Sequence, residues 1–411
     1  TADFLVSRKK LIIQRLNENR KLLGKMMKRS STVPSKQMAH LMRKITDCND
    51  ALAQIEHSAR ESFVSATGYA RNLLPLSGKE PQRYAKYSSD PLLGVQTYPL
   101  IIHILILSIF EGGLRVMMNN RGFERHTVGR ISYYYHPGVS TDDMKEHNGE
   151  DNNDVDCDES QEDEHDDDNI PLVFVHGIGV GLIPYMPLID GLLKTGRPIL
   201  LPELPFVTGF RIWQGPNAVL RPDEVTNAVM AMLATHGYYH GVFLGHSYGT
   251  SWLSYMLKKA PDAIAAVLFL DPICFCLHVP RLTKQFVYVR ADPGTISYMV
   301  RTDIITNWTI QRSFPWSWII LFAEQINVPC SVFLSELDAL VPSERVEKYL
   351  RLKGAPVMSA DEADKEHFGS GDITVTVLKG EIHGDWTERP SRIPKIIECV
   401  DALYDKATVR S

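Results

Sequence analysis

Short apolar runs without polar alternation recur along the second half of the chain, separated from one another by segments of helical character. They occupy residues 171–176, 198–201, 241–244, 266–270, 331–334 and 373–377. Strands that lack an exposed polar face are buried on both sides, as in a parallel sheet covered by helices. An aromatic-rich strand is expected earlier, at Ile131–His136. The pattern therefore predicts an α/β fold with a mostly parallel sheet and helices on both faces.

Helical periodicity appears between these strands and again at both ends of the chain. Pro222 begins a helix that Gly237 ends, and a terminal helix is expected around residues 396–403. Within residues 1–60, apolar positions recur at helical spacing over 12–26 and 38–55, with Pro34 between them. Residues 1–60 are therefore predicted to form a basic helical hairpin extension. It would pack on the main domain, support oligomerisation or contact an acidic membrane surface.

Residues 91–118 form a separate apolar segment, and no charged residue lies between Pro91 and Phe110. A spanning helix needs about 20 predominantly apolar residues. Here Pro99 and His103 interrupt the first half, so the unbroken apolar run is nearer twelve residues. Three interpretations stay open at this stage: a transmembrane helix, a helix lying in the plane of a membrane interface, and a buried helix.

Composition identifies the chain as an ordinary globular protein and excludes collagen-like, wholly disordered and multi-span membrane classes. It has 411 residues, of which 44% are hydrophobic and 23% charged, and its net charge is −5. Residues 141–169 contain fifteen Asp and Glu and one Lys, which is −14 and leaves +9 for the remainder. We predict that this segment is a disordered acidic insertion, and that a membrane surface rather than nucleic acid is the macromolecular partner.

Neither a disulfide framework nor a metal site is predicted. The six cysteines include no C-x-x-C pair, which favours a reducing, intracellular location. Asp154, Asp156 and Asp158 have the spacing of calcium ligands. However, Glu159 stands where an EF-hand loop needs glycine, and His165 stands where it needs a bidentate Glu. We therefore expect no metal and no organic cofactor.

One motif carries candidate chemistry: Gly245-His-Ser-Tyr-Gly249, at the junction of the strand at 241–244 and the helix after it. A nucleophile elbow needs a strand before it, a helix after it and small flanking residues, so Ser247 is the predicted nucleophile. A serine hydroxyl needs a base, and His383 follows the last predicted strand. The acid should follow the preceding strand, where Asp338 is the first candidate and Glu336 the reserve.

Two backbone N–H groups are expected to form an oxyanion hole. Tyr248, directly after the serine, supplies one, and Ile178 in the loop after the first buried strand supplies the other. Gly177 lets that loop approach closely, and His176 is interpreted as a structural residue that fixes the loop by hydrogen bonds.

These motifs, in this order, resemble the α/β-hydrolase superfamily over residues 125–405. The similarity rests on the H-G loop at His176, the G-H-S-Y-G elbow, the L-D-A-L-V-P acid motif and the H-G histidine at His383. Within the superfamily the serine is similar to that of esterases, lipases and thioesterases. The resemblance also implies a helical cap, which corresponds here to the aromatic-rich residues 272–329.

The expected function is a serine hydrolase that cleaves carboxylic, lipid-type esters through an acyl-enzyme. The apolar segment and the aromatic cap favour lipid esters as substrates and a membrane-associated protein. An acyltransferase or thioesterase with the same triad remains an alternative, as does an inactive membrane-anchored scaffold. The residues that bind the substrate are not predicted.

Overall fold

The computed structural model describes residues 92–138, 170–209, 218–289, 291–359 and 373–408, with isolated positions among the first fifty. The chain divides into two compact units, residues 1–90 with 234–239, and residues 91–233 with 240–411. The second unit contains the sheet and the candidate site. The predicted hairpin of residues 1–60, apart from a few single positions, and the acidic insertion of residues 141–169 lie outside the described residues. Both interpretations therefore stay predictions.

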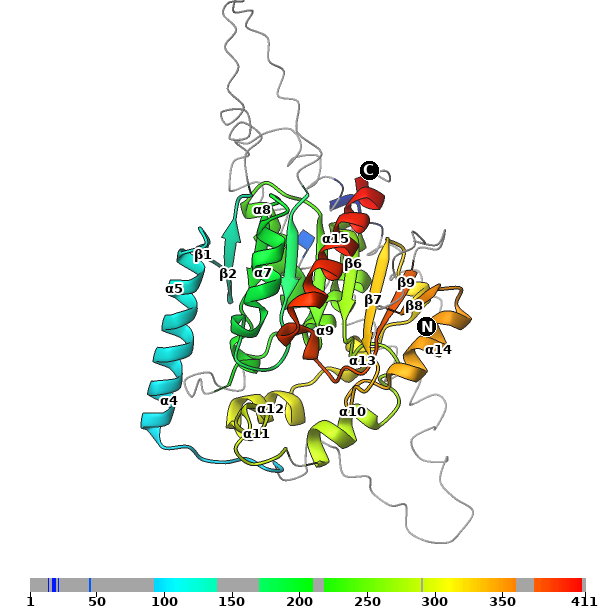
Figure 1. The fold of residues 1–411 in the computed structure, drawn as a ribbon. Helices are drawn as coiled ribbons and strands as arrows, with labels where there is room; N and C mark the ends of the chain where they lie inside the picture. The colour runs from blue at the N-terminus through cyan, green and yellow to red at the C-terminus, as the bar shows by residue number, and fades with distance from the viewer. Residues whose placement is uncertain are drawn as a thin grey trace, which may run out of the picture. The chain divides into compact units, whose positions relative to one another are not determined.

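A single sheet organises the second unit (Figure 1). Within the described residues its strand order is β1-β2-β4-β3-β5-β6-β7-β9-β8. The first two pairings, β1 with β2 and β2 with β4, are antiparallel, and every later pairing is parallel. The strands are Glu124–Val128 (β1), Ile131–His136 (β2), Leu172–Val175 (β3), Ile199–Pro202 (β4), Gly241–His246 (β5), Ile264–Leu270 (β6), Cys330–Ser335 (β7), Val357–Ser359 (β8) and Ile373–Leu378 (β9).

The prediction of an α/β fold with a mostly parallel sheet is confirmed. Two edge strands were not predicted. Glu124–Val128 has a largely exposed, charge-rich sequence, and Val357–Ser359 is only three residues long. Both lie at the ends of the sheet, where one side of the strand needs no apolar cover. A hydrophobic pattern therefore gives little sign of either.

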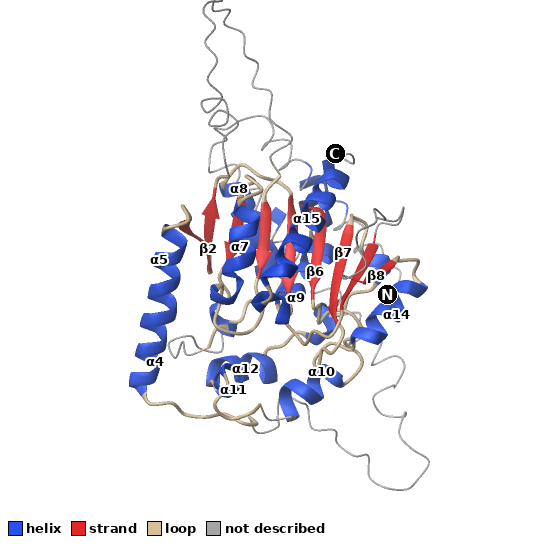
Figure 2. Ribbon diagram, in the orientation of Figure 1, coloured by secondary structure: helices blue, strands red, loops and turns tan. Residues whose placement is uncertain are grey.

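Helices cover both faces of the sheet (Figure 2). On one face α7 and α15 pack with Leu172, Phe174 and Leu268 in the main apolar core. On the other face α9 packs against β5, where Leu253 lies over Gly245. The longer helices of the second unit include Met186–Leu193 (α7), Pro222–Thr235 (α8, whose last two residues fall in the first unit), Gly249–Lys259 (α9), Ser343–Leu352 (α14) and Ile393–Thr408 (α15).

The apolar segment forms one helical stretch, Leu100–Asn119, long and apolar enough to cross a membrane. It consists of α4 (Leu100–Leu107), a π-helical turn η2 (Ser108–Gly112) and α5 (Gly113–Asn119). Leu114 and Met118 of α5 join the main core, whereas four of the eight residues of α4 are exposed. Because only 11% of its most apolar window is buried, this is not a core helix. The spanning and interfacial interpretations remain.

Residues 272–329, the predicted cap, form short helices beyond the strand ends (Figure 1). These are Arg281–Thr283 (α10), Lys284–Tyr288 (η7), Ile296–Thr302 (α11), Ile304–Arg312 (α12) and Trp316–Ile319 (α13). Their aromatic residues divide into two groups. Phe275 and Phe314 are buried, whereas Tyr288 and Phe322 are about half exposed. The segment therefore has both a small core of its own and an exposed apolar surface.

Candidate active site

Ser247 lies in a tight turn between β5 and α9, as the elbow motif predicts. Its φ of 51° is in the left-handed region, which non-glycine residues rarely adopt and which often marks functional strain. The turn depends on its flanking glycines. A Cβ on Gly249 would lie 2.0 Å from the carbonyl oxygen of Val175, and one on Gly245 would lie 2.9 Å from Leu253. The small residues at both flanks are therefore required by close approach of the backbone.

A three-residue relay links Ser247 to residues that lie far away in the sequence. His383 Nε2 lies 2.8 Å from Ser247 Oγ, and His383 Nδ1 lies 2.6 Å from Asp338 Oδ2. Ser247 follows β5, Asp338 follows β7 and His383 follows β9. Because all three strands are parallel, their carboxyl ends meet at one edge of the sheet. The structure thus brings together the three residues that the sequence nominates.

The structure distinguishes between the two candidate acids. The Asp338 side chain is fully buried, and its Oδ1 accepts the backbone N–H groups of Leu340 and Val341. Those bonds leave Oδ2 for His383. Glu336 instead lies at the surface, where it pairs with Lys379 and accepts the N–H of Gly380. The reserve candidate is therefore not part of the relay.

The electrostatics of the relay favour a charged imidazole. Burial alone would lower the pKa of His383, but the charge and hydrogen bond of Asp338, with the charge of Asp271, outweigh it. The net effect raises the pKa of His383 to about 9. An imidazole that gains a proton during a reaction is stabilised by the same two carboxylates. In the neutral ring, Nε2 can accept a proton from Ser247 while Nδ1 donates to Asp338, and the charged ring that results is the favoured form.

The two predicted oxyanion donors are available. Within the described residues, the N–H groups of Ile178 and Tyr248 have no acceptor in the protein. Neighbouring bonds fix the loop of Ile178: Gly177 N–H donates to Tyr185 Oη, and Gly179 N–H donates to the carbonyl of Val207. A Cβ on Gly177 would lie 3.0 Å from Ser247 Cβ, so this loop passes directly beside the serine.

His176 fixes the start of the same loop. Its Nε2 accepts the N–H of Leu204, so its Nδ1 carries the proton and donates to the carbonyl of Gly177. Both ring nitrogens are thereby used for local structure. This geometry agrees with the interpretation of His176 as a structural residue.

A buried carboxylate behind the relay was not assigned a role from the sequence. Asp271 follows β6 with a φ of 45°, and its two oxygens accept the N–H groups of Ser335 and Gly384. It thereby connects the end of β7, before the acid loop, to the residue after His383. His246 lies nearby, with Nε2 3.8 Å from Asp271 Oδ2, and burial lowers the pKa of this histidine. In the sequence, only the position of Asp271 directly after a predicted strand could have marked it as a candidate site residue.

Three of these groups also have the composition of a metal site. Asp271, Asp338 and His383 each bring one ligand atom to within 4.8 Å of the others. Each group already has protein partners, however: backbone N–H groups for Asp271, and one another for Asp338 and His383. A cation at this point would compete with the His383–Asp338 hydrogen bond. The arrangement therefore fits a proton relay better than a metal centre.

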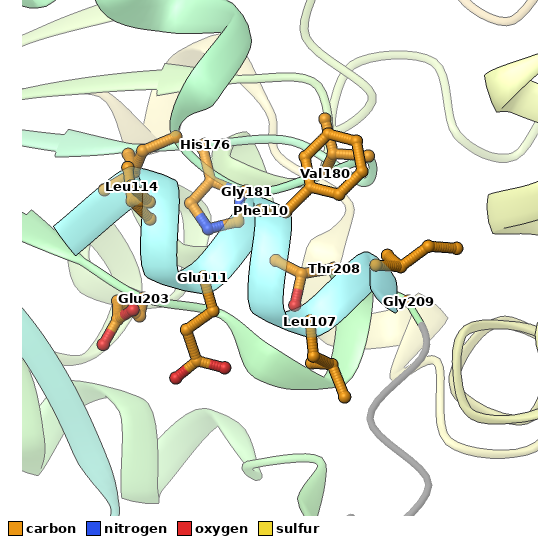
Figure 3. Close-up of a pocket in the computed structure, with 12 residues that line it drawn as sticks. Leu107, Phe110, Glu111, Leu114, His176, Val180, Gly181, Glu203, Thr208 and Gly209 are labelled. Carbon is orange, nitrogen blue, oxygen red and sulfur yellow. The ribbon is translucent and has the colours of Figure 1, made fainter. Parts of the chain in front are cut away.

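A small pocket lies beside the loop that carries Ile178, which we call the oxyanion loop after its predicted role, and its cavity volume is about 30 Å³. Figure 3 shows its two sides. Leu107 and Phe110 enter it from the exposed apolar helix, while Val180 and Gly181 belong to the loop that carries Ile178. The apolar helix and the loop beside Ser247 are thus neighbours across this pocket.

Comparisons with known proteins give structural matches only. No protein-family model and no curated protein sequence matches the chain. Among solved structures, the chain is similar to a bacterial membrane phospholipase A at 13% identity and a TM-score of 0.46, covering 75% of this chain and 94% of that one. A thermophilic esterase from Thermogutta terrifontis gives 15% and 0.41, covering 69% and 99%. A mutant of potato epoxide hydrolase gives 13% and 0.42, covering 68% and 99%.

These neighbours include a phospholipase, an epoxide hydrolase and an esterase, so they do not indicate the activity of this chain. Its architecture is clear from its own strand order. The first strands of the sheet pair antiparallel and the later ones pair parallel. A serine with left-handed backbone dihedral angles follows β5, and a histidine follows β9. The protein has the α/β-hydrolase fold.

Proposed function

We propose that the protein is a serine hydrolase that cleaves carboxylic esters through an acyl-enzyme intermediate. The observation that carries the proposal is the position of His383 between Ser247 and Asp338, at 2.8 Å and 2.6 Å. A hydroxyl at this distance from a buried, carboxylate-oriented imidazole is an activated nucleophile. The N–H groups of Ile178 and Tyr248, which have no acceptor among the described residues, would stabilise the negative charge that develops on the carbonyl oxygen of the ester.

The reaction proceeds in two transfers. Ser247 Oγ attacks the ester carbonyl as His383 Nε2 takes its proton, and the Ile178 and Tyr248 N–H groups stabilise the oxyanion. Collapse of this intermediate breaks the ester bond, and His383 returns the proton to the leaving alcohol. Water then attacks the acyl-serine with His383 again as base, which releases the carboxylic acid and restores Ser247. Asp338 orients the imidazole and stabilises its charged form throughout.

The chemistry of the surroundings favours lipid-type esters. The pocket beside the oxyanion loop is lined on one side by Ile106, Leu107 and Phe110 of the apolar helix. The opposite face of that helix is exposed. The same apolar helix therefore lies next to the loop beside Ser247 on one face and is open to solvent or lipid on the other. An ester with a long acyl chain suits such a surface better than a small polar ester does.

An acyltransferase or a thioesterase would use the same residues. The fate of the acyl group distinguishes a transferase from a hydrolase, whereas a thioesterase also releases the free acid and differs in the leaving group, which is a thiol. If the protein is a hydrolase, a 4-nitrophenyl ester incubated with it should yield mainly the free acid, with or without an excess of an alcohol acceptor, because water is then the acceptor of the acyl group. Chromatography of the products measures this ratio. A new ester that replaces most of the free acid would identify a transferase, and no product in either case would favour the inactive scaffold.

We also propose that the protein works at a membrane, with the helix Leu100–Asn119 as its lipid-contacting element. Ile101, Ile104 and Leu105 are 58%, 50% and 48% exposed, an arrangement that is costly in water and favourable in lipid. The triple variant Ile101→Gln, Ile104→Gln, Leu105→Gln should lower the fraction that sediments with lipid vesicles by about tenfold or more.

A matched control is Leu352→Gln, which removes an exposed leucine from α14 on another part of the unit. It should leave vesicle binding unchanged, and all variants should hydrolyse a short soluble ester at the same rate. Equal sedimentation of the triple variant and the unmodified protein would contradict the membrane role of the helix without affecting the proposed chemistry.

A further inference from the structure

A second cavity lies in the cap segment and contains none of the relay or oxyanion residues. Its volume is about 540 Å³, within the range of small-molecule sites. Its walls come from residues 93–96, from the end of η7 with the segment after it, and from α11 and α12. Most lining side chains are apolar or aromatic, among them Val95, Phe286, Val287, Tyr288 and Tyr298. Such walls suit a hydrocarbon chain.

Arg301 is the one cation among the described residues that line this cavity. Its Nη2 donates to the carbonyl groups of Gln285, Phe286 and Val289, and its guanidinium carbon lies 4.8 Å from the centre of the Phe286 ring. Within the described residues, Nε and Nη1 donate to no protein acceptor, and no carboxylate pairs with Arg301. Three of the five guanidinium N–H donors, one on Nε and two on Nη1, thus have no protein acceptor among the described residues.

The nearest acid along the chain does not compensate this charge. Asp303 is buried and uses Oδ2 to cap α12 through the N–H groups of Ile305 and Thr306. Burial lowers the pKa of Arg301, with no opposing contribution from an anion. A half-buried cation without a counter-charge is costly, and an anion that enters the cavity would remove that cost.

We propose that the cap cavity binds an anionic amphiphile, with a carboxylate or phosphate head on the free N–H groups of Arg301 and an apolar chain along the walls. A planar guanidinium pairs with either head through two parallel hydrogen bonds. Leu93, Tyr288 and Val289 at the walls are 39%, 54% and 42% exposed, which leaves an apolar entrance. Residues 93–96 line this cavity, and α4 begins four residues later at Leu100. The source of the ligand would therefore be the same lipid phase.

The test measures binding rather than turnover, so it is independent of the proposed hydrolysis. The Ser247→Ala protein is titrated calorimetrically with dodecanoate, dodecyl phosphate, dodecanol and inorganic phosphate, each below its micelle concentration. Both anionic amphiphiles should bind at least about tenfold more tightly than dodecanol or inorganic phosphate, because charge-assisted hydrogen bonds add to burial of the chain. Tighter binding of the phosphate indicates a phospholipid-type ligand, and tighter binding of the carboxylate indicates a fatty acid.

Two further variants in the same background locate the site, and a third is their control. Arg301→Gln should abolish the preference for anions and leave dodecanol binding unchanged. Ala291→Trp places a large side chain in the wall of the cavity, reduces its volume while retaining Arg301, and should weaken binding of every amphiphile. Lys284→Gln removes an exposed lysine of η7 that does not line the cavity, and it should change nothing.

Arg301 also supports three carbonyl groups, so Arg301→Lys is the alternative if Arg301→Gln does not fold. It should retain part of the anion preference because its charge remains, while two parallel bonds are lost. Equal binding of dodecanol and both anions by the Ser247→Ala protein would overturn the proposal. Undiminished anion binding by Ala291→Trp would also overturn it.

Discussion

Replacement of Ser247 by alanine is expected to lower kcat/KM for a 4-nitrophenyl ester by about 10⁴-fold or more, because the acyl-enzyme cannot form. The remaining activity would come from His383 and the N–H groups of Ile178 and Tyr248, acting on water. Steady-state kinetics on the purified protein measures the loss, with circular dichroism as the check on folding.

Ser254 provides a matched control on the same helix. It is also buried, but its Oγ donates to the carbonyl of Trp318 and has no contact with His383. Ser254→Ala should keep most of the activity. If Ser247→Ala and Ser254→Ala hydrolyse the ester equally well, Ser247 is not the nucleophile.

Substitution of Asp338 by asparagine should cost about 10⁴-fold in kcat, since an amide cannot hold the reactive tautomer of His383 or stabilise its charge. Glu336→Gln is the matched control, because Glu336 pairs with Lys379 at the surface instead of with His383. It should change kcat by less than about twofold. A large loss in Glu336→Gln together with normal activity in Asp338→Asn would reverse the assignment of the acid.

We expect the Asp338→Asn variant also to change the dependence of the hydrolysis rate on pH. Catalysis needs neutral His383, so the rate of the unmodified protein should rise with pH through the raised pKa of this residue, about 9. Asp338→Asn removes the largest contribution that opposes burial. The pKa of His383 should therefore fall, and the rising limb of the profile should move to lower pH while the maximum rate decreases. A limb that stays in place would contradict the charge coupling between Asp338 and His383.

Much of this architecture is visible in the sequence because buried parallel strands are continuous apolar runs. The strands β3, β5 and β7 are recognisable as such runs. Each is followed by a loop that contributes residues to the candidate site. The order serine, acid, histidine then follows from the order of the strands. The edge strands β1 and β8 escape the pattern because they are exposed or very short.

The supporting residues could not be predicted because they act through contacts between distant loops. Asp271 accepts N–H groups from Ser335 and Gly384, which are 64 and 113 positions away in the chain. Tyr185 likewise joins Gly177 to His246 only in the folded protein. The cap cavity around Arg301 depends on residues 93–96, which lie about 180 positions before the start of the cap at residue 272. Local periodicity contains no signal for such pairings.

The central claim is that Ser247 is a nucleophile activated by His383, and reaction with a fluorophosphonate probe tests it most directly. Such a probe forms a covalent bond with a serine whose hydroxyl is activated by a neighbouring base. Digestion and mass spectrometry of the treated protein should find one probe group, on the peptide that contains Gly245-His-Ser-Tyr-Gly249, and none in the Ser247→Ala variant. An unmodified peptide in the active protein, or equal labelling of the variant, would contradict the account.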